Sequence, residues 1–101
     1  MNYGRYFLLA ALLSSPAQAE MSPEERCEKQ GDVAQKAANM RMSEVDKETA
    51  VNTLTRIYDR PGSGVTALNI NGLTTVAYMT RMKPEKMREY AVTECRKGIL
   101  K

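Results

Sequence analysis

The sequence contains no histidine and no tryptophan, a single phenylalanine and only two cysteines among its 101 residues. Histidine is the side chain most often used as a general base, and its imidazole is a usual ligand of zinc and copper. Its absence excludes serine and cysteine triads that depend on histidine. Glycines are also few, and none has the spacing of a phosphate-binding loop. We therefore predict a protein that is not an enzyme and that has no cofactor.

Long apolar runs are absent except near the start of the chain. Arg5 precedes the apolar run Tyr6–Leu13, and the small residues of Ala17–Ala19 provide a cleavage motif. This order is typical of a secretory signal peptide. The run is shorter than the ~20 apolar residues that a transmembrane helix needs. We predict that residues 1–19 are a signal peptide, that no membrane span remains after cleavage, and that the protein is periplasmic or secreted.

The rest of the chain, residues 20–101, is long enough for a single small domain. A domain of this length buries a small core and often needs a covalent cross-link. Disulfides persist outside the cytosol, and two cysteines allow only one intramolecular pairing. We therefore predict a disulfide between Cys27 and Cys95, and the alternative is a pair of buried free thiols.

A first helix is predicted to begin at Pro23. Ser22 is a suitable N-cap, and Glu25 stands at the position that completes a capping box. Small and apolar residues then recur every three or four positions, which is typical of an amphipathic helix. They are Cys27, Gly31, Ala34, Ala38 and Met42, with Val33, Ala37 and Met40 beside them.

A second helix is predicted to follow and to end near Tyr58. We expect Ser43 to cap it, with Asp46 at the reciprocal position of the capping box. Its apolar positions are Ala50, Val51, Leu54, Ile57 and Tyr58. Proline and two glycines within residues 59–64 then predict a loop.

Residues 65–78 fit two kinds of structure. Asn71-Gly72 between two apolar segments is a strong hairpin signal, which gives a β-hairpin over 65–78. The same residues also fit a helix, because a set of them shares one helical face. That set is Val65, Leu68, Gly72, Leu73, Val76 and Ala77.

The predicted disulfide favours the helix over the hairpin. A last helix begins near Pro84, and its Cys95 can reach Cys27 only if the first and last helices are antiparallel. Four alternating helices joined by short loops produce that arrangement. We therefore predict an all-α fold, a four-helix up-down bundle with one disulfide, and the alternative is three helices with the hairpin.

Charge is unevenly distributed along the chain. Residues 20–59 contain nine acidic and six basic residues, whereas residues 60–101 contain three acidic and eight basic residues. This asymmetry can indicate an anionic partner, or two halves that pack against each other. We favour the second explanation, because the disulfide would bring the acidic residues of the first helix to the basic residues of the last. These are Glu24, Glu25, Glu28 and Asp32 on one side, and Arg88, Arg96 and Lys97 on the other.

Methionine is the one side chain of this sequence with unusual binding chemistry. Methionines pack irregular gaps and form adaptable protein-binding surfaces. We predict a contact surface near the junction of the third and fourth helices, formed by Met79, Arg81, Met82, Lys83, Lys86 and Met87. Thioethers also bind Cu(I), so a weaker alternative is a copper site. Its ligands would be Met40, Met42, Met79 and Met82, if the two groups lie at the same end of the bundle.

The chain resembles a loose group of small exported bacterial proteins of mostly unassigned function. The likeness consists of a signal peptide, an early helical cysteine, Ala77-Tyr78 near the third helix and a late cysteine. It implies a small helical domain with a disulfide, but no residue roles.

We therefore expect an exported helical protein that binds another protein without catalysis, in an inhibitor, immunity or chaperone-like role. The alternatives are a copper-binding accessory protein and a basic module that binds envelope polymers. Nucleic acid is not an expected partner, because only Tyr78 and Tyr90 could stack on bases in the basic half. The sequence does not specify the partner or the oligomeric state.

Overall fold

The computed structural model describes residues 21–99, which form four helices and no strand. The helices are α2 (Pro23–Met42), α3 (Lys47–Tyr58), α4 (Ala67–Thr80) and α5 (Pro84–Ile99). The all-α prediction is therefore confirmed. The predicted signal peptide, residues 1–19, lies outside the described residues.

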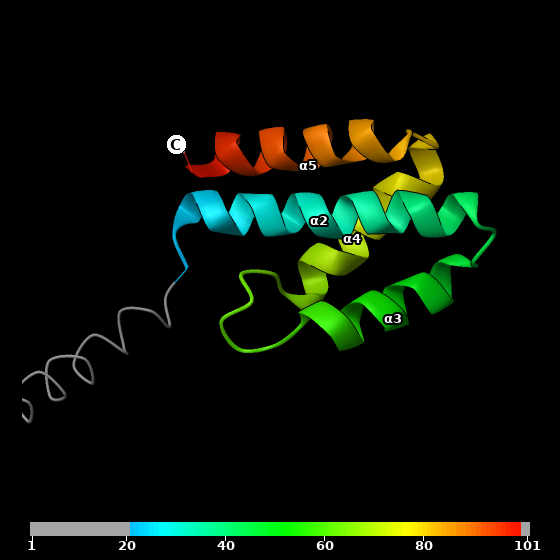
Figure 1. The fold of residues 1–101 in the computed structure, drawn as a ribbon, viewed down its shortest axis with the longest axis horizontal. Helices are drawn as coiled ribbons and strands as arrows, with labels where there is room; N and C mark the ends of the chain where they lie inside the picture. Colours follow the sequence, from blue (N-terminus) through cyan, green and yellow to red (C-terminus); the bar gives the residue numbers. More distant parts are fainter. Residues whose placement is uncertain (1–20, 100–101) are drawn as a thin grey trace, which may run out of the picture.

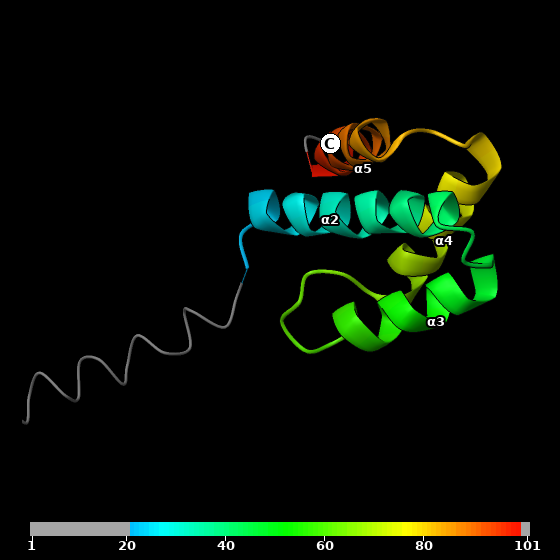
Figure 2. The ribbon, with the colours of Figure 1, turned by 45° about the vertical axis from the view of Figure 1, so that its right-hand side comes forward.

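The helices alternate in direction, and α2 is the central one (Figure 1). The three other helices all pack against α2, and α4 also packs against α3. α5 lies beside α2 in both ribbon views, whereas α3 lies on the other side of α2 (Figure 2). One consequence is that α4 has a side that none of the described helices covers.

The disulfide joins the first turns of α2 to the last turns of α5. Cys27 and Cys95 are bonded, with their Cα atoms 5.4 Å apart. Antiparallel packing of the first and last helices, which the disulfide requires, is confirmed. The two helices approach closely at Gly31, where an added Cβ would lie 2.7 Å from Cγ2 of Val92. Glycine is therefore needed at this point of contact.

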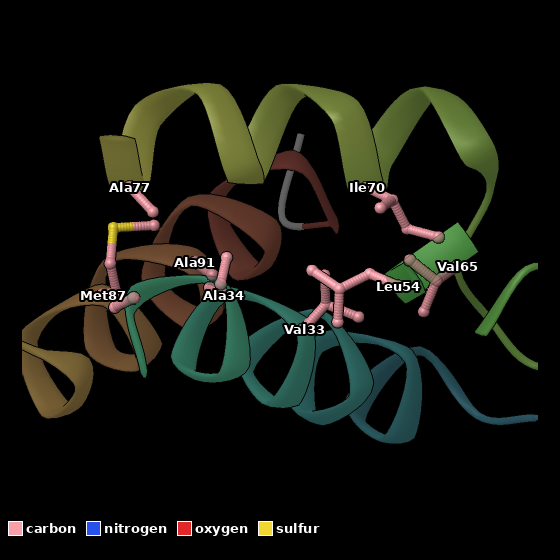
Figure 3. Close-up of a cluster of buried hydrophobic side chains, with 10 residues drawn as sticks. Val33, Ala34, Leu54, Val65, Ile70, Ala77, Met87 and Ala91 are labelled. Carbon is pink, nitrogen blue, oxygen red and sulfur yellow. The ribbon is translucent and has the colours of Figure 1, made fainter. Parts of the chain in front are cut away.

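The core lies between α2 and the other three helices (Figure 3). Leu54, Ile70 and Met87 are the largest fully buried side chains, and Met87 of α5 extends toward Ala77 of α4. α2 contributes mainly small residues, which let its neighbours come close. The buried residues of α2 are Cys27, Gly31, Val33, Ala34, Ala37 and Ala38.

The first predicted capping box is confirmed and the second is wrong. Ser22 and Glu25 form reciprocal hydrogen bonds at the start of α2. α3, however, is capped by Asp46, whose carboxylate accepts from the N–H and the hydroxyl of Thr49. Ser43 instead ends α2. The turn between these helices occupies the residues that were expected to begin α3.

The stretch 65–78 is helical, and the hairpin alternative is excluded. Thr66 and Asn69 form a capping box at the start of α4, and the helix continues through Asn71 and Gly72. The predicted face of this helix is correct only in part: Val65 and Ala77 are buried, and Leu73 and Val76 pack against the core. Its buried side chains are Ile70, Thr74 and Ala77, whereas Leu68 and Gly72 are exposed.

Candidate functional site

The side of α4 that faces away from the core forms an uncharged surface. Leu68, Gly72, Thr75 and Met79 recur at intervals of four, three and four residues, so they lie on one side of a helix with 3.6 residues per turn. We call these four residues the α4 outer face. Leu68 is 80% exposed and Met79 is 77% exposed, and about 16 Å of helix separates them.

The whole of α4 lacks charged residues, which is unusual for a helix with an exposed side. Gly72 lies at the middle of the outer face, and an added Cβ there would meet no atom of the chain within 4 Å. Glycine within a helix costs about 1 kcal/mol relative to alanine. No contact among residues 21–99 accounts for this glycine, but a backbone approaching from outside would.

A basic segment follows the outer face at the end of α4. Arg81 and Lys83 are both exposed, and neither forms an ion pair within residues 21–99. Arg81 has a φ of 61°, so it is left-handed at the C-cap of α4. This conformation favours glycine and costs other residues roughly 1–2 kcal/mol. The basic side chain is therefore held next to Met79 at a cost in stability.

The end of α4 is fixed by two hydrogen bonds to neighbouring elements. Arg41 donates from Nη1 to the carbonyl of Ala77 over 2.7 Å, and the Tyr78 hydroxyl donates to the carbonyl of Val45 over 2.6 Å. Burial, and secondarily the negative charge of Asp46, raise the pKa of Tyr78 above its ordinary value. The hydroxyl therefore stays protonated and keeps its hydrogen bond.

The structure separates the residues of the predicted contact surface. Met79, Arg81 and Lys83 are exposed, and Met82 is half-buried against the core. Met87 is fully buried, so it belongs to the core and is removed from the surface.

Lys86 is exposed, but its ammonium group pairs with Glu89 at 3.4 Å. Leu68, in contrast, was missed, because it was placed on the buried face of the third helix. The absence of charged residues from 67–80 was the sequence feature that could have pointed to this surface.

Both methionine groups lie at one end of the bundle. α2 ends and α5 begins beside the last turn of α4, so Met40, Met42, Met79 and Met82 share this end (Figures 1 and 2). The helices therefore place the two methionine groups at the same end of the bundle, as a shared copper site would require. Met40 and Met82 pack against the core, whereas Met42 is 60% exposed.

Three of the four acidic residues of α2 pair with Arg88 and Arg96 of α5, as expected, whereas Glu25 serves the capping box and Lys97 pairs with Glu94 of its own helix at 3.1 Å. Arg88 donates to Asp32, to Glu28 and to the side-chain oxygen of Gln35. Arg96 bonds Glu24, with its Nε 3.1 Å from Oε2. Arg88 and Arg96 are therefore paired within the fold, and the unpaired positive charge lies on other residues.

Neither a metal cluster nor a membrane span is found in the described part of the chain. Residues 21–99 contain no group of three or more acidic or cysteine side chains that could hold a metal ion. No helix in the same range combines the length and apolar character needed to cross a bilayer.

The sequence matches no family model, and neither curated proteins nor solved structures show significant similarity to it.

Proposed function

We propose that this is an exported, non-catalytic protein that binds another protein through the α4 outer face and the basic residues Arg81 and Lys83. The observation that supports this proposal most directly is an exposed helix side with no charge, bordered by two cations that have no ion-pair partner within residues 21–99. The disulfide is compatible with an oxidising compartment. The proposed roles are those of an inhibitor, an immunity protein or a chaperone-like protein.

The chemistry of this surface defines the partner. Leu68 and Met79 require apolar side chains opposite them, and Gly72 allows close approach of a backbone. Arg81 and Lys83 require a carboxylate at the end nearest Met79. We infer that the partner presents an apolar segment, such as one side of a helix, followed by acidic residues.

The conformation of Arg81 supports this assignment. A glycine would serve the C-cap of α4 at lower cost, yet an arginine occupies it. Backbone strain of this kind is concentrated at functional sites. A role for the guanidinium in binding explains why the strained residue carries a long cationic side chain.

Designed peptides can test the surface directly. Two amphipathic helical peptides with identical apolar sides would carry either Glu or Lys at one end. We expect the acidic peptide to bind the oxidised protein at least tenfold more tightly, with NMR shifts confined to α4 and residues 81–83. Leu68→Glu combined with Met79→Glu should reduce binding by at least tenfold.

Ile57→Glu is the control, because Ile57 is an apolar residue that is 50% exposed on α3 and does not belong to the α4 outer face. It should leave peptide binding within twofold of the unmodified protein. Equal binding of the two peptides, or shifts centred on another helix, would contradict the proposed surface.

A copper-binding role is the second candidate, because the four methionines share one end of the bundle. Cu(I) would be titrated against a competing chelator, in the oxidised protein and in the variant Met79→Leu/Met82→Leu. A copper protein should lose at least tenfold in affinity in this variant, whereas a protein-binding surface should show no copper affinity to lose.

A further inference from the structure

A second polar feature lies at the opposite end of α4 from Met79. It is a cleft of about 640 Å³ between the first half of α2 and the loop 59–66. Its lining includes Arg26 and Gln30 from α2, Arg60 from the loop, and Asn69 from α4. Ligand sites in proteins commonly have volumes of roughly 300–1,000 Å³. The protein-binding surface proposed above does not use this cleft.

The loop is built closely onto the stem of Arg26. Gly64 has a φ of +83°, and a Cβ added there would lie 2.8 Å from Cγ of Arg26 and 2.6 Å from Sδ of Met21. Only glycine allows both the backbone conformation and this close contact. The contact holds the aliphatic part of Arg26 against the loop, and Arg26 is one of the residues that line the cleft.

The two arginines that line the cleft have unused hydrogen-bond donors. Neither Arg26 nor Arg60 forms an ion pair with any residue in 21–99. Arg60 uses Nε for the carbonyl of Ile57, over 3.3 Å, which leaves its two terminal nitrogens. The backbone N–H groups of Gly62 and Gly64 have no acceptor in the same part of the chain. Unused donors of this kind suit an anionic ligand.

The start of α4 contributes little to the cleft. Thr66 and Asn69 satisfy each other in a capping box, with both bonds at 3.1 Å. The candidate site therefore rests on the two guanidinium groups and the loop amides. Among residues 21–99, Asp59 is the one carboxylate that lines the cleft, and it pairs with neither arginine.

We propose that this cleft binds a phosphate group, either as free phosphate or as a monoester on a larger molecule. Two guanidinium groups match the charge of a phosphate dianion, and each can bind two of its oxygens. The amides of Gly62 and Gly64 supply further donors. Asp59 opposes the anion, which limits the affinity for phosphate.

NMR titration of the oxidised protein with inorganic phosphate, at constant ionic strength, tests this site. We expect saturable shifts of the Gly62 and Gly64 amides. Arg26→Met keeps the stem that packs on Gly64 and removes the charge, so it should weaken binding at least fivefold. Arg60→Met should do the same, and Asp59→Asn should strengthen binding severalfold.

Arg56→Met is the matched control, because it removes an exposed arginine of α3 that does not line the cleft. It should change the dissociation constant by less than twofold. Equal losses in Arg56→Met and Arg60→Met, or shifts that rise linearly without saturation, would overturn the site. If Arg26→Met fails to fold, Arg60→Met in the exposed loop decides the outcome alone.

Glycerol phosphate distinguishes the two sources of the group. Binding at least tenfold tighter than inorganic phosphate assigns the cleft to a monoester on a larger molecule. Comparable binding of the two assigns it to free phosphate. Failure of both ligands to produce saturable shifts refutes the proposal and leaves the α4 surface unaffected.

Discussion

At the scale of single residues, Thr74 stands out because its hydroxyl oxygen is fully buried and has no hydrogen-bond partner among residues 21–99. A buried polar atom without a partner costs about 1–3 kcal/mol. Ile70 and Ala77, which are buried on the same side of α4, are apolar and offer the hydroxyl no partner. Valine has nearly the same shape and no polar atom.

We therefore expect Thr74→Val to raise the free energy of unfolding by about 1 kcal/mol. Urea denaturation of the oxidised protein would measure the change, with Thr75→Val, on the α4 outer face, as a control. A loss of stability in Thr74→Val would show that its hydroxyl does have a partner in solution.

Tyr78 provides a pH-dependent contribution to stability. Its pKa is raised in the folded state, so the stabilisation is fully present below the ordinary value of about 10 and is lost as pH rises further. Tyr78→Phe removes the hydrogen bond to Val45 and should cost about 1 kcal/mol at pH 7.

The difference in unfolding free energy between Tyr78→Phe and the unmodified protein should shrink above pH 10. The other tyrosines and the lysines titrate in both proteins, so their contributions cancel in this difference. Denaturation at several pH values between 7 and 11 provides the measurement. A difference that stays constant up to pH 11 would contradict the assigned role of the hydroxyl.

At the scale of the helices, the glycines of α2 and α4 have opposite roles. Gly31 allows the contact with Val92 of α5, whereas Gly72 faces open space. Gly31→Ala should lower the free energy of unfolding by about 1–2 kcal/mol, because overpacking outweighs the gain in helix propensity. Gly72→Ala should raise it by about 1 kcal/mol.

Both variants replace a glycine by an alanine, so the difference between their unfolding free energies reports only the surroundings of each position. Chemical denaturation of the two variants would measure it. Gly72→Ala should also weaken binding of the acidic peptide to the protein, because a methyl group would occupy the middle of the outer face. If both variants were equally stabilised, the close contact between α2 and α5 would not exist in solution.

The sequence predicted where the helices lie better than which way they face. Ser22 and Glu25 marked the first helix start correctly, because a capping box is a local interaction. α4 has no charged residue on any side, so periodicity alone could not identify its buried face, and Leu68 was assigned to the wrong one. The cleft formed by Arg26 and Arg60 could not be predicted, since these residues meet only through tertiary packing.

At the scale of the whole molecule, the disulfide accounts for a large part of the stability. The bond between Cys27 and Cys95 closes a segment with a sequence separation of 68 residues. The loop-entropy relation gives roughly 4 kcal/mol for such a segment, and small domains are stable by about 5–15 kcal/mol. Conditions that reduce this bond would therefore remove a substantial part of the stability of the domain.

The variant Cys27→Ala/Cys95→Ala should lose about 4 kcal/mol in unfolding free energy. A reducing agent should destabilise the unmodified protein to a similar extent and leave the variant unchanged. Chemical denaturation with and without the reductant measures both effects. Two titratable thiols in the native protein before reduction would disprove the bond.

The bond between α2 and α5 also makes the segment from Cys27 to Cys95 a covalent ring. A single proteolytic cut in the glycine-containing loop 59–66 would open this ring without releasing a fragment, since sulfur still connects the two pieces. The nicked protein would migrate as one species until it is reduced. New chain ends could accordingly be engineered at this loop while all four helices stay attached.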